Sequence, residues 1–397
     1  MGKRALIIGG SVGGLFAANL LYDRGWQVDV YERAGEELAS RGAGIGTHEE
    51  LFDVLRRLAI PVEGLGIRVA ERICLDAGGA VVHRIPWGHV MTHWARIYQP
   101  LKARLPRARY HSAKNLVGIE RAGAQVLARF SDGREATGDL LIGADGLRSA
   151  VRALLFPAVE PRYAGYVGWR GIVAEDALPR ELRSRFHAAY YFQLPPGEMM
   201  LCYPVPGAGE RDWNYLWYRP TKSEAELRDL CTDAQGVHHG TAIPPPLVRP
   251  DLGQRIKETA SRLLAPQIAA LVALSQPYFQ AIFDVESPAI GANGVALLGD
   301  AAFVARPHVG MGVTKAALDA LCLSSSLEQA GNDIPAALER YDRLRGEFGR
   351  RCVARGRRIG AYIEAAVKGI ALEQSPERIL REVGAALPDI PELALEI

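Results

Sequence analysis

The chain opens with an apolar run, a glycine-rich turn and a second apolar stretch. Residues 5–8 are all apolar, as in a buried parallel strand. Residues 15–24 follow with helical spacing and stop at Gly25, where a left-handed C-cap is expected. Residues 27–31 then return to a strand pattern. This order predicts one strand–helix–strand unit.

Two further apolar runs lie far along the chain, and each ends in a short polar turn. Residues 140–143 run into an Ala-Asp-Gly turn, and residues 295–298 run into a Gly-Asp turn. A helical pattern follows from about 312 to 328. Polar turns after parallel strands collect at one edge of a sheet. The pattern therefore predicts one sheet that is assembled from distant segments.

Between these runs the pattern changes to short alternating segments. Residues 76–90 and about 160–250 hold most of the tryptophans and tyrosines and many prolines, with alternation at 190–194 and 213–218. A period of two predicts a second, mostly antiparallel sheet. Residues 336–374 carry Arg, Glu and Ala at helical spacing and predict terminal helices.

Composition narrows the functional classes. The 47 Lys+Arg and 45 Asp+Glu leave a formal charge of +2, and no basic block stands out. We therefore expect no nucleic-acid partner and no membrane partner, and no apolar stretch is long enough to span a bilayer. The five cysteines are scattered without a CxxC pair. We expect no metal site and a reducing, cytoplasmic location.

The glycine-rich turn follows a known chemical pattern. Gly9, Ser11 and Gly14 occupy the three glycine slots of GxGxxG, with the small serine in the second. Such a turn lets the backbone approach a pyrophosphate and presents helix amides to it. Glu32 comes at the end of the second strand, where a carboxylate can accept the hydrogen bonds of an adenosine ribose. This arrangement predicts dinucleotide binding.

The two remote turns indicate which dinucleotide is bound. A plain nicotinamide dehydrogenase has no need of them, whereas the longer FAD does. With these turns the chain resembles the PHBH-type flavoprotein aromatic hydroxylases over about positions 5–345. The motifs that carry the resemblance are residues 9–14 with Glu32, residues 143–146 with Ser149 and Arg152, and residues 299–302 with Pro307, Gly310 and Gly312.

The resemblance implies an α/β fold with three parts. A Rossmann-like FAD-binding domain would comprise residues 1–75, 101–160 and 281–345. A substrate domain, interleaved with the first and built on a mostly antiparallel β-sheet, would comprise residues 76–100 and 161–280. Residues 346–397 would form a C-terminal helical region. Only one dinucleotide fingerprint is present, which fits a family whose nicotinamide cofactor has no domain of its own.

The resemblance also implies how FAD is held, without a covalent bond. Glu32 would bind the adenosine ribose, Asp145 would support the pyrophosphate, and Asp300 would bind the ribityl or pyrophosphate portion. Taken singly, Asp300 could equally be a helix cap and Asp145 a turn former. A helix starting near Gly310 would direct its positive end at the flavin. The expected contacts are Gly9, Ser11, Val12, Gly14, Glu32, Arg33, Gln99, Asp145, Gly299, Asp300, Pro307, Gly310 and Gly312.

The implied reaction works best when a ring hydroxyl is ionised. In the family, NADH or NADPH reduces FAD, O2 adds to form a flavin C4a-hydroperoxide, and the distal oxygen passes to an electron-rich ring. A base that titrates near neutrality would help. His308 and His48 are the first candidates, and a tyrosine such as Tyr215 or Tyr203 could orient the hydroxyl. An imidazole that only fills space or bonds a carbonyl is the alternative for both histidines.

One departure from the family concerns the helix expected to cover the flavin. Many members carry an arginine in the slot where this chain has Trp94, so Arg96 becomes a candidate substitute.

The substrate expected from the resemblance is a small hydroxylated aromatic ring. Similar segments, among them Trp169-Arg170-Gly171 and Arg306-Pro307-His308, favour a hydroxypyridine. The alternatives are another flavin oxidoreductase, an epoxidase or a halogenase, and a non-catalytic FAD-binding sensor. A halogenase should carry a WxWxIP segment, which the sequence lacks. The partners would be the substrate and O2, and a homodimer stays open.

Overall fold

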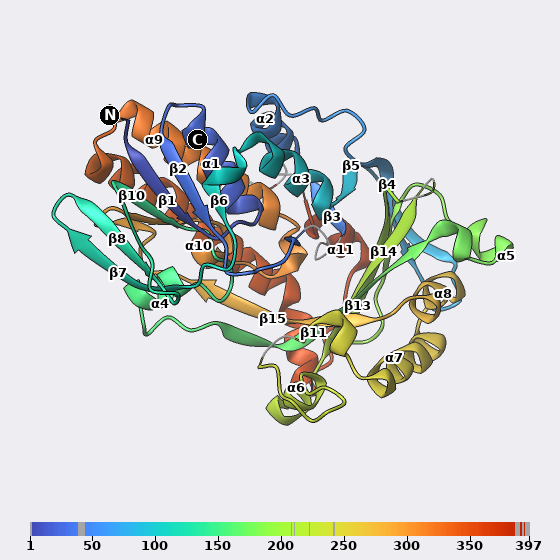
Figure 1. Ribbon diagram of the computed structural model, residues 1–397. Coiled ribbons are helices and arrows are strands. Elements are labelled where there is room, and N and C mark those ends of the chain that lie inside the picture. Colours follow the sequence, from blue (N-terminus) through green and yellow to red (C-terminus); the bar gives the residue numbers. More distant parts are fainter. Residues whose placement is uncertain are drawn as a thin grey trace.

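In the computed structural model the chain forms two large sheets, which are bridged by a long helix (Figure 1). The structure describes residues 2–38, 44–207, 209, 211–221, 223–240, 243–385, 390 and 393.

The first sheet confirms the predicted assembly from distant segments. β1 pairs in parallel with β2 and β10, and β10 pairs in parallel with β17. The order across this six-stranded sheet is β16 (Gly291–Ala292), β17 (Val295–Leu297), β10 (Leu140–Gly143), β1 (Arg4–Ile8), β2 (Gln27–Tyr31) and β6 (Tyr110–His111). The carboxyl ends of β1, β10 and β17 therefore lie side by side.

Two helices that pack against each other begin at this edge of the sheet. They are α1 (Val12–Tyr22) and α9 (Gly312–Gln329). α1 begins at Val12, earlier than the expected residue 15, because the glycines allow the first helical turn to press on the strand. A Cβ at Gly14 would lie 1.9 Å from the Gly9 carbonyl oxygen. As expected, Gly25 takes the left-handed conformation just after α1, with φ of 79°.

The second sheet has nine strands and is antiparallel except where β12 meets β4. Its order is β18 (Phe303–Val304), β15 (Tyr278–Glu286), β11 (Arg162–Ala174), β14 (Asp212–Pro220), β13 (Met199–Val205), β12 (Tyr190–Gln193), β4 (Ile67–Leu75), β5 (Val81–His93) and β3 (Gly44–Thr47). One face packs on α7 (Pro250–Leu263) and α8 (Pro266–Leu274) through a buried core that includes Trp213 and Trp217.

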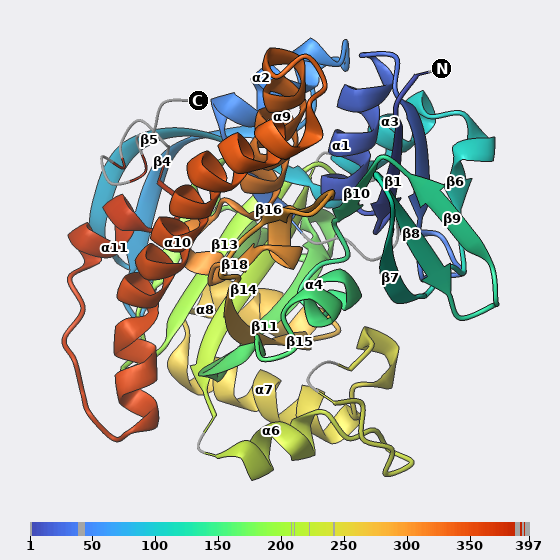
Figure 2. The ribbon, with the colours of Figure 1, turned by 90° about the vertical axis from the view of Figure 1, so that its left-hand side faces the viewer.

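The helix that bridges the sheets is α10 (Ile334–Val367), which crosses the front of the view in Figure 2. Near its start, the Tyr341 hydroxyl donates to the Leu297 carbonyl of β17 at 2.8 Å. Near its end, Glu364 forms an ion pair with Arg306 at 3.0 Å, and α10 packs on β11, β14 and β15. One continuous helix therefore fixes how the two sheets lie relative to each other.

The remaining elements complete the layers. A three-stranded sheet of β7 (Leu116–Ala122), β8 (Gln125–Phe130) and β9 (Glu135–Gly138) packs beside β1 and β10. The other helices are α2 (Glu49–Arg57), α3 (Trp94–Arg104), α4 (Ala150–Leu155), α5 (Arg180–Arg183), α6 (Glu224–Leu230) and α11 (Pro376–Glu382). Among the helices in the described ranges, none combines the length and the apolar content needed to cross a bilayer.

Strand pairing differs from the segment limits drawn from the sequence. β3 and β4 fall within residues 1–75 but pair in the nine-stranded sheet, as does β18 from residues 281–345. The limit at 345/346 falls inside α10. Periodicity identifies a strand without showing which sheet it joins, because the partner strands are remote in the sequence.

Candidate active site

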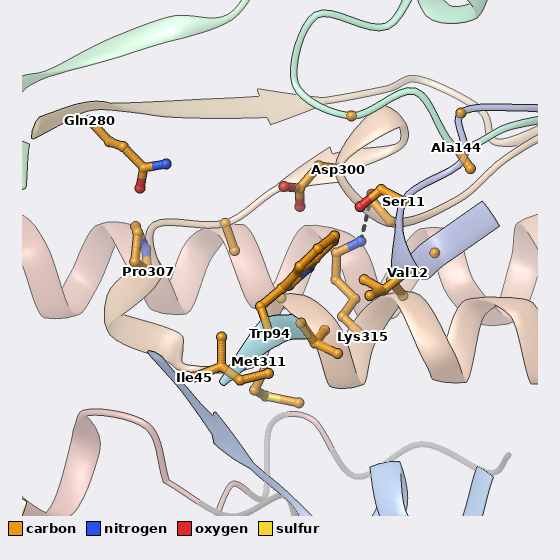
Figure 3. A pocket seen from close by; sticks show the side chains of 18 of the residues that line it. Ser11, Val12, Ile45, Trp94, Ala144, Gln280, Asp300, Pro307, Met311 and Lys315 are labelled. Atoms are coloured by element: carbon orange, nitrogen blue, oxygen red, sulfur yellow. Dashed lines mark hydrogen bonds between the residues drawn. The ribbon is translucent and has the colours of Figure 1, made fainter. Parts of the chain in front are cut away.

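A cavity of about 650 Å³ lies between the two sheets. One side is formed by the turns after β1, β2, β10 and β17, and the other by side chains of the nine-stranded sheet. Figure 3 shows Ser11, Ala144 and Asp300 from these turns, and Gln280 from β15, around the same space. The predicted convergence of the glycine-rich turn and the two remote turns is confirmed.

Two helix N-termini reach the cavity without a side-chain cap. Ser11 precedes α1 and Met311 precedes α9, and neither accepts a capping hydrogen bond. By contrast, Ser149 caps α4 and Asp333 caps α10. Uncapped N-terminal amides and the positive ends of the helices favour an anionic ligand group. The two ends therefore fit the phosphates and the electron-rich flavin edge of FAD.

Glu32 is fixed at the end of β2 by backbone amides. Its carboxylate accepts from the Gly10 N–H at 2.7 Å and from the Ala34 N–H at 2.8 Å. The side chain of Glu32 is buried, and it lines the cavity. The neighbouring Arg33 is exposed but also belongs to the lining. These bonds hold the carboxylate in one orientation, which fits the predicted contact with a ribose.

The two aspartates of the remote turns differ in how they are bonded. The Asp145 carboxylate accepts from the Ser149 hydroxyl at 2.5 Å and from the Ala150 N–H at 2.7 Å, so it also holds the start of α4. No hydrogen bond joins the Asp300 carboxylate to another described residue, and it faces the cavity (Figure 3). Loss of hydration raises the pKa of Asp300, although Lys315 partly offsets this effect. Asp300 is thus free to meet a ligand, whereas Asp145 also serves as a turn former.

Lys315, which we did not select from the sequence, lies beside Asp300 in the cavity wall. Its ammonium group donates to the Gly299 carbonyl at 2.7 Å and forms an ion pair with Asp319 at 3.2 Å. Asp319 also pairs with Arg345 at 2.7 Å. Although burial opposes it, the two cations lower the pKa of Asp319. The sequence could have indicated Lys315 through helical spacing, because this residue lies about one helical turn after Gly312, which was an expected contact.

The turn before α9 is narrow and needs glycine. Gly310 has a φ of 71°, and a Cβ there would lie 2.7 Å from the Cα of Gly384. The Gly384 N–H donates to the His308 carbonyl at 2.8 Å. Gly299, Pro307, Gly310 and Gly312 all line the cavity. The C-terminal segment therefore closes this side of the expected flavin site.

The nine-stranded sheet provides an aromatic chamber at the far side of the cavity. Its lining side chains come from alternate positions of five neighbouring strands and are Arg170, Tyr190, Leu201, Tyr203, Leu216, Tyr218, Tyr278 and Gln280. Burial raises the pKa of Tyr203 and of Tyr218, so both phenols are neutral near pH 7. The chamber thus combines apolar walls with neutral hydroxyl groups and one guanidinium.

Tyr215 does not reach the chamber, which corrects its assignment. Along β14 the residues that face the cavity are Leu216 and Tyr218, so Tyr215, which alternates with them, points to the other face of the sheet. Tyr215 lies in the core against α7 and α8, where its hydroxyl pairs with that of Ser275 at 2.8 Å. Tyr203, the other tyrosine considered, does line the cavity.

The two candidate histidines are also outside the cavity lining. His308 is fully buried, and its Nε2 lies 2.7 Å from the Tyr166 hydroxyl. His48 is buried, with its Nδ1 2.9 Å from the Thr314 hydroxyl. Burial lowers the pKa of His308 to about 3 and that of His48 to about 4. Neither imidazole lines the cavity, and so low a pKa makes each a weak base, so neither is suited to deprotonate a ligand there.

Of the other residues expected near FAD, some line the cavity and some do not. Gln99 is exposed on α3 and does not line the cavity, and Arg96 is also exposed. Trp94, at the start of α3, does line the cavity and stacks on Tyr98 with ring centroids 4.6 Å apart. Gly14 lies behind the wall and serves helix packing, whereas Gly9 and Val12 belong to the lining.

Fold and cavity together define a flavoprotein whose dinucleotide site opens onto an aromatic chamber. A family model described as "FAD binding domain-like" matches residues 163–284. The chain is 30% identical to 2,6-dihydroxypyridine 3-monooxygenase of Paenarthrobacter nicotinovorans, over 85% of this chain and 86% of the relative. It is 27% identical to 6-hydroxynicotinate 3-monooxygenase of Bordetella bronchiseptica, over 87% and 88%.

Solved structures agree with this relationship. The structure of 2,6-dihydroxypyridine-3-hydroxylase from Arthrobacter nicotinovorans superposes with a TM-score of 0.88 and 27% identity, covering 96% of each chain. This chain belongs to the FAD-dependent aromatic hydroxylase family, and it is an aromatic-ring monooxygenase.

Proposed function

We propose that this enzyme uses NADH or NADPH and O2 to hydroxylate a small hydroxylated aromatic ring, and that the ring is a hydroxypyridine. The observation that carries the proposal is one continuous cavity that joins the dinucleotide turns to the aromatic chamber. Two relatives support the choice of ring, because their names give 2,6-dihydroxypyridine and 6-hydroxynicotinate as the compounds that they act on.

FAD, once bound without a covalent link, would supply the redox and oxygen-activating chemistry. We assign the α1 N-terminus at Ser11 to the phosphates, Glu32 to the adenosine ribose and Asp300 to the ribityl hydroxyls. The α9 N-terminus after Gly310 would stabilise negative charge on the flavin edge. The glycine turns leave room for this contact, since a Cβ at Gly312 would meet no atom within 4 Å.

The chamber residues would bind and orient the ring. Leu201 and Leu216 exclude water from the ring faces, while Gln280 and Tyr203 offer hydrogen bonds at the ring edge. The one histidine among the described lining residues is His89, whose pKa burial holds well below the ordinary value. The chamber thus favours a ring hydroxyl that is already ionised over one that a histidine deprotonates.

A substrate screen tests the proposal. Purified protein with FAD is supplied with NADH or NADPH and a panel of hydroxypyridines and phenols, and nucleotide oxidation and product mass are both followed. We expect one hydroxypyridine to accelerate oxidation and to gain one oxygen atom, which labelled O2 supplies. Acceleration by no member of the panel would contradict the proposal and favour an FAD-binding sensor. A halogenated or epoxidised product would favour the other flavin oxidoreductases.

A further inference from the structure

Arg170 projects from the middle of the nine-stranded sheet into the aromatic chamber. Its neighbours across β11 are Leu216 of β14 and Tyr278 of β15, and all three line the cavity. Its side chain is only partly buried, because it borders the cavity. The guanidinium therefore meets whatever occupies the chamber.

This guanidinium has no counter-ion within the described part of the chain. The Nε atom of Arg170 is buried and makes no hydrogen bond, and no ion pair joins Arg170 to a described carboxylate. The described carboxylates of the lining are Glu32, Asp145 and Asp300, which all lie in turns of the six-stranded sheet. Arg306 also lines the cavity, but Asp284 and Glu364 compensate its charge.

The groups around Arg170 are neutral hydrogen-bond donors. The charge of Arg170 acts on the pKa of four tyrosines of the lining, which are Tyr190, Tyr203, Tyr218 and Tyr278. No hydrogen bond joins their hydroxyls to another described residue. Burial raises the pKa of each, and the charge of Arg170 offsets only part of that effect. Together they surround one fixed positive charge with neutral hydroxyls.

We propose that Arg170 binds an ionised oxygen substituent of the aromatic substrate. A partly buried, unpaired guanidinium favours an anionic partner, and its planar donors suit a ring oxyanion or a carboxylate. The tyrosine hydroxyls would complete the hydrogen bonds of that oxygen. This inference rests on the proposed function and narrows its substrate class to aromatic anions.

Such a contact would also serve the reaction. A ring that carries a negative oxygen is richer in electrons than its neutral form, and a nearby cation favours the ionised form on binding. The chamber would then need no histidine base, in agreement with the placement of His48 and His308 outside the lining.

The test measures binding to the holoenzyme rather than turnover. Arg170→Met removes the charge, Arg170→Gln keeps hydrogen-bonding groups, and Arg170→Lys keeps the charge. Arg162→Met, at the exposed start of the same strand, is the matched control. The probes are 2,6-dihydroxypyridine, 6-hydroxynicotinate and the neutral 2,6-dimethoxypyridine, titrated at pH 8 while the flavin absorbance is followed. FAD content and circular dichroism report whether each variant is folded.

We expect Arg170→Met to weaken binding of the ionised probes at least tenfold, or about 1.4 kcal/mol. Arg170→Lys should retain part of the affinity, whereas Arg162→Met and the dimethoxy probe should show no change. If Arg170→Met does not bind FAD, the comparison of Arg170→Gln with Arg170→Lys carries the test. If the substitutions of Arg170 weaken binding of 6-hydroxynicotinate alone, the partner of Arg170 is the carboxylate. If they weaken binding of both ionised probes, the partner is the ring oxygen.

Two results would overturn the inference. One is equal affinity of wild type and folded Arg170 variants for the ionised probes. The other is that neither ionised probe binds the wild type better than the dimethoxy compound. The proposed function fails separately: probes that bind through Arg170 but never accelerate NADH or NADPH oxidation would contradict the proposed hydroxylation of a hydroxypyridine and leave the anion site standing.

Discussion

At the scale of single residues, similar sequence motifs proved to have different bonding. Asp145 and Asp300 each follow a buried strand and each line the cavity. Asp145 accepts hydrogen bonds from Ser149 and from the start of α4, whereas Asp300 makes none with described residues. Asp300 is therefore the residue whose loss should act on the ligand and not on the fold.

We predict that Asp300→Asn weakens FAD binding at least tenfold without unfolding the protein. A hydrogen bond to a charged group contributes about 1.5–3 kcal/mol, and the amide cannot replace it fully. The dissociation constant is measured by flavin fluorescence after ultrafiltration, and circular dichroism checks the fold. Asp53→Asn, on the exposed face of α2, is the control. A variant that retains wild-type affinity would remove Asp300 from the site.

The alternating strands show what residue patterns leave open. The sequence indicates that Trp213, Tyr215 and Trp217 share one face of a strand, and they do. It does not indicate which face meets the cavity, because a period of two has two phases and both faces of this strand carry buried apolar or aromatic side chains. Packing on α7 and α8 decides the phase, so Tyr203 and Tyr218 line the chamber and Tyr215 does not.

At the scale of elements, a buried arginine of the sheet adds hydrogen bonds to the apolar packing of the C-terminal helix α11. Arg72 of β4 donates to the carbonyls of Leu380 at 2.6 Å, Val383 at 2.5 Å and Gly384 at 2.8 Å. Its guanidinium also lies over the Trp87 ring, 4.4 Å from the centroid. Because Gly384 lines the cavity, Arg72 links the end of α11 to the expected flavin site.

We predict that Arg72→Met destabilises the protein by about 3 kcal/mol, since three buried carbonyls lose their donor. Urea unfolding of the FAD-free protein measures this loss, and limited proteolysis should release the C-terminal segment earlier than in the wild type. Arg68→Met, at an exposed position of the same strand, should change neither. Unchanged unfolding and proteolysis in Arg72→Met would show that other contacts hold α11.

At the scale of the whole molecule, the functional site lies between two sheets that one helix holds together. The six-stranded sheet provides the dinucleotide turns, the nine-stranded sheet provides the chamber, and α10 packs on both. This closed arrangement buries His308 and His48 in the core around the cavity. Their burial links the stability of the whole fold to pH.

The unfolding free energy should fall as the pH is lowered below about 6.5. Burial lowers the pKa of His308 to about 3 and that of His48 to about 4. In the unfolded chain both titrate near 6.5, so below that pH the unfolded state binds more protons. Below pH 6.5, each of these two histidines lowers the unfolding free energy by about 1.4 kcal/mol per pH unit, until the pH reaches its pKa in the folded state.

Unfolding in urea between pH 7 and pH 5 measures this effect. His308→Asn should lower the stability at pH 7, because the contact with Tyr166 is lost, yet its stability should depend less on pH than that of the wild type. His238→Asn, in an exposed loop, should leave the dependence unchanged. The prediction is contradicted when wild type and His308→Asn lose stability in parallel.

The sequence by itself determined the dinucleotide fingerprint, the three strands with polar turns and the two kinds of sheet. Each of these depends on residues close together in the chain, such as Gly9 with Gly14, or on one repeated period. The tertiary structure alone decided which of the aromatic, histidine and arginine side chains outside these turns line the cavity. Tyr215, His48 and His308 turned inward and Arg170 faced the cavity, because strand register, the phase of each strand and helix packing are set by contacts between distant segments.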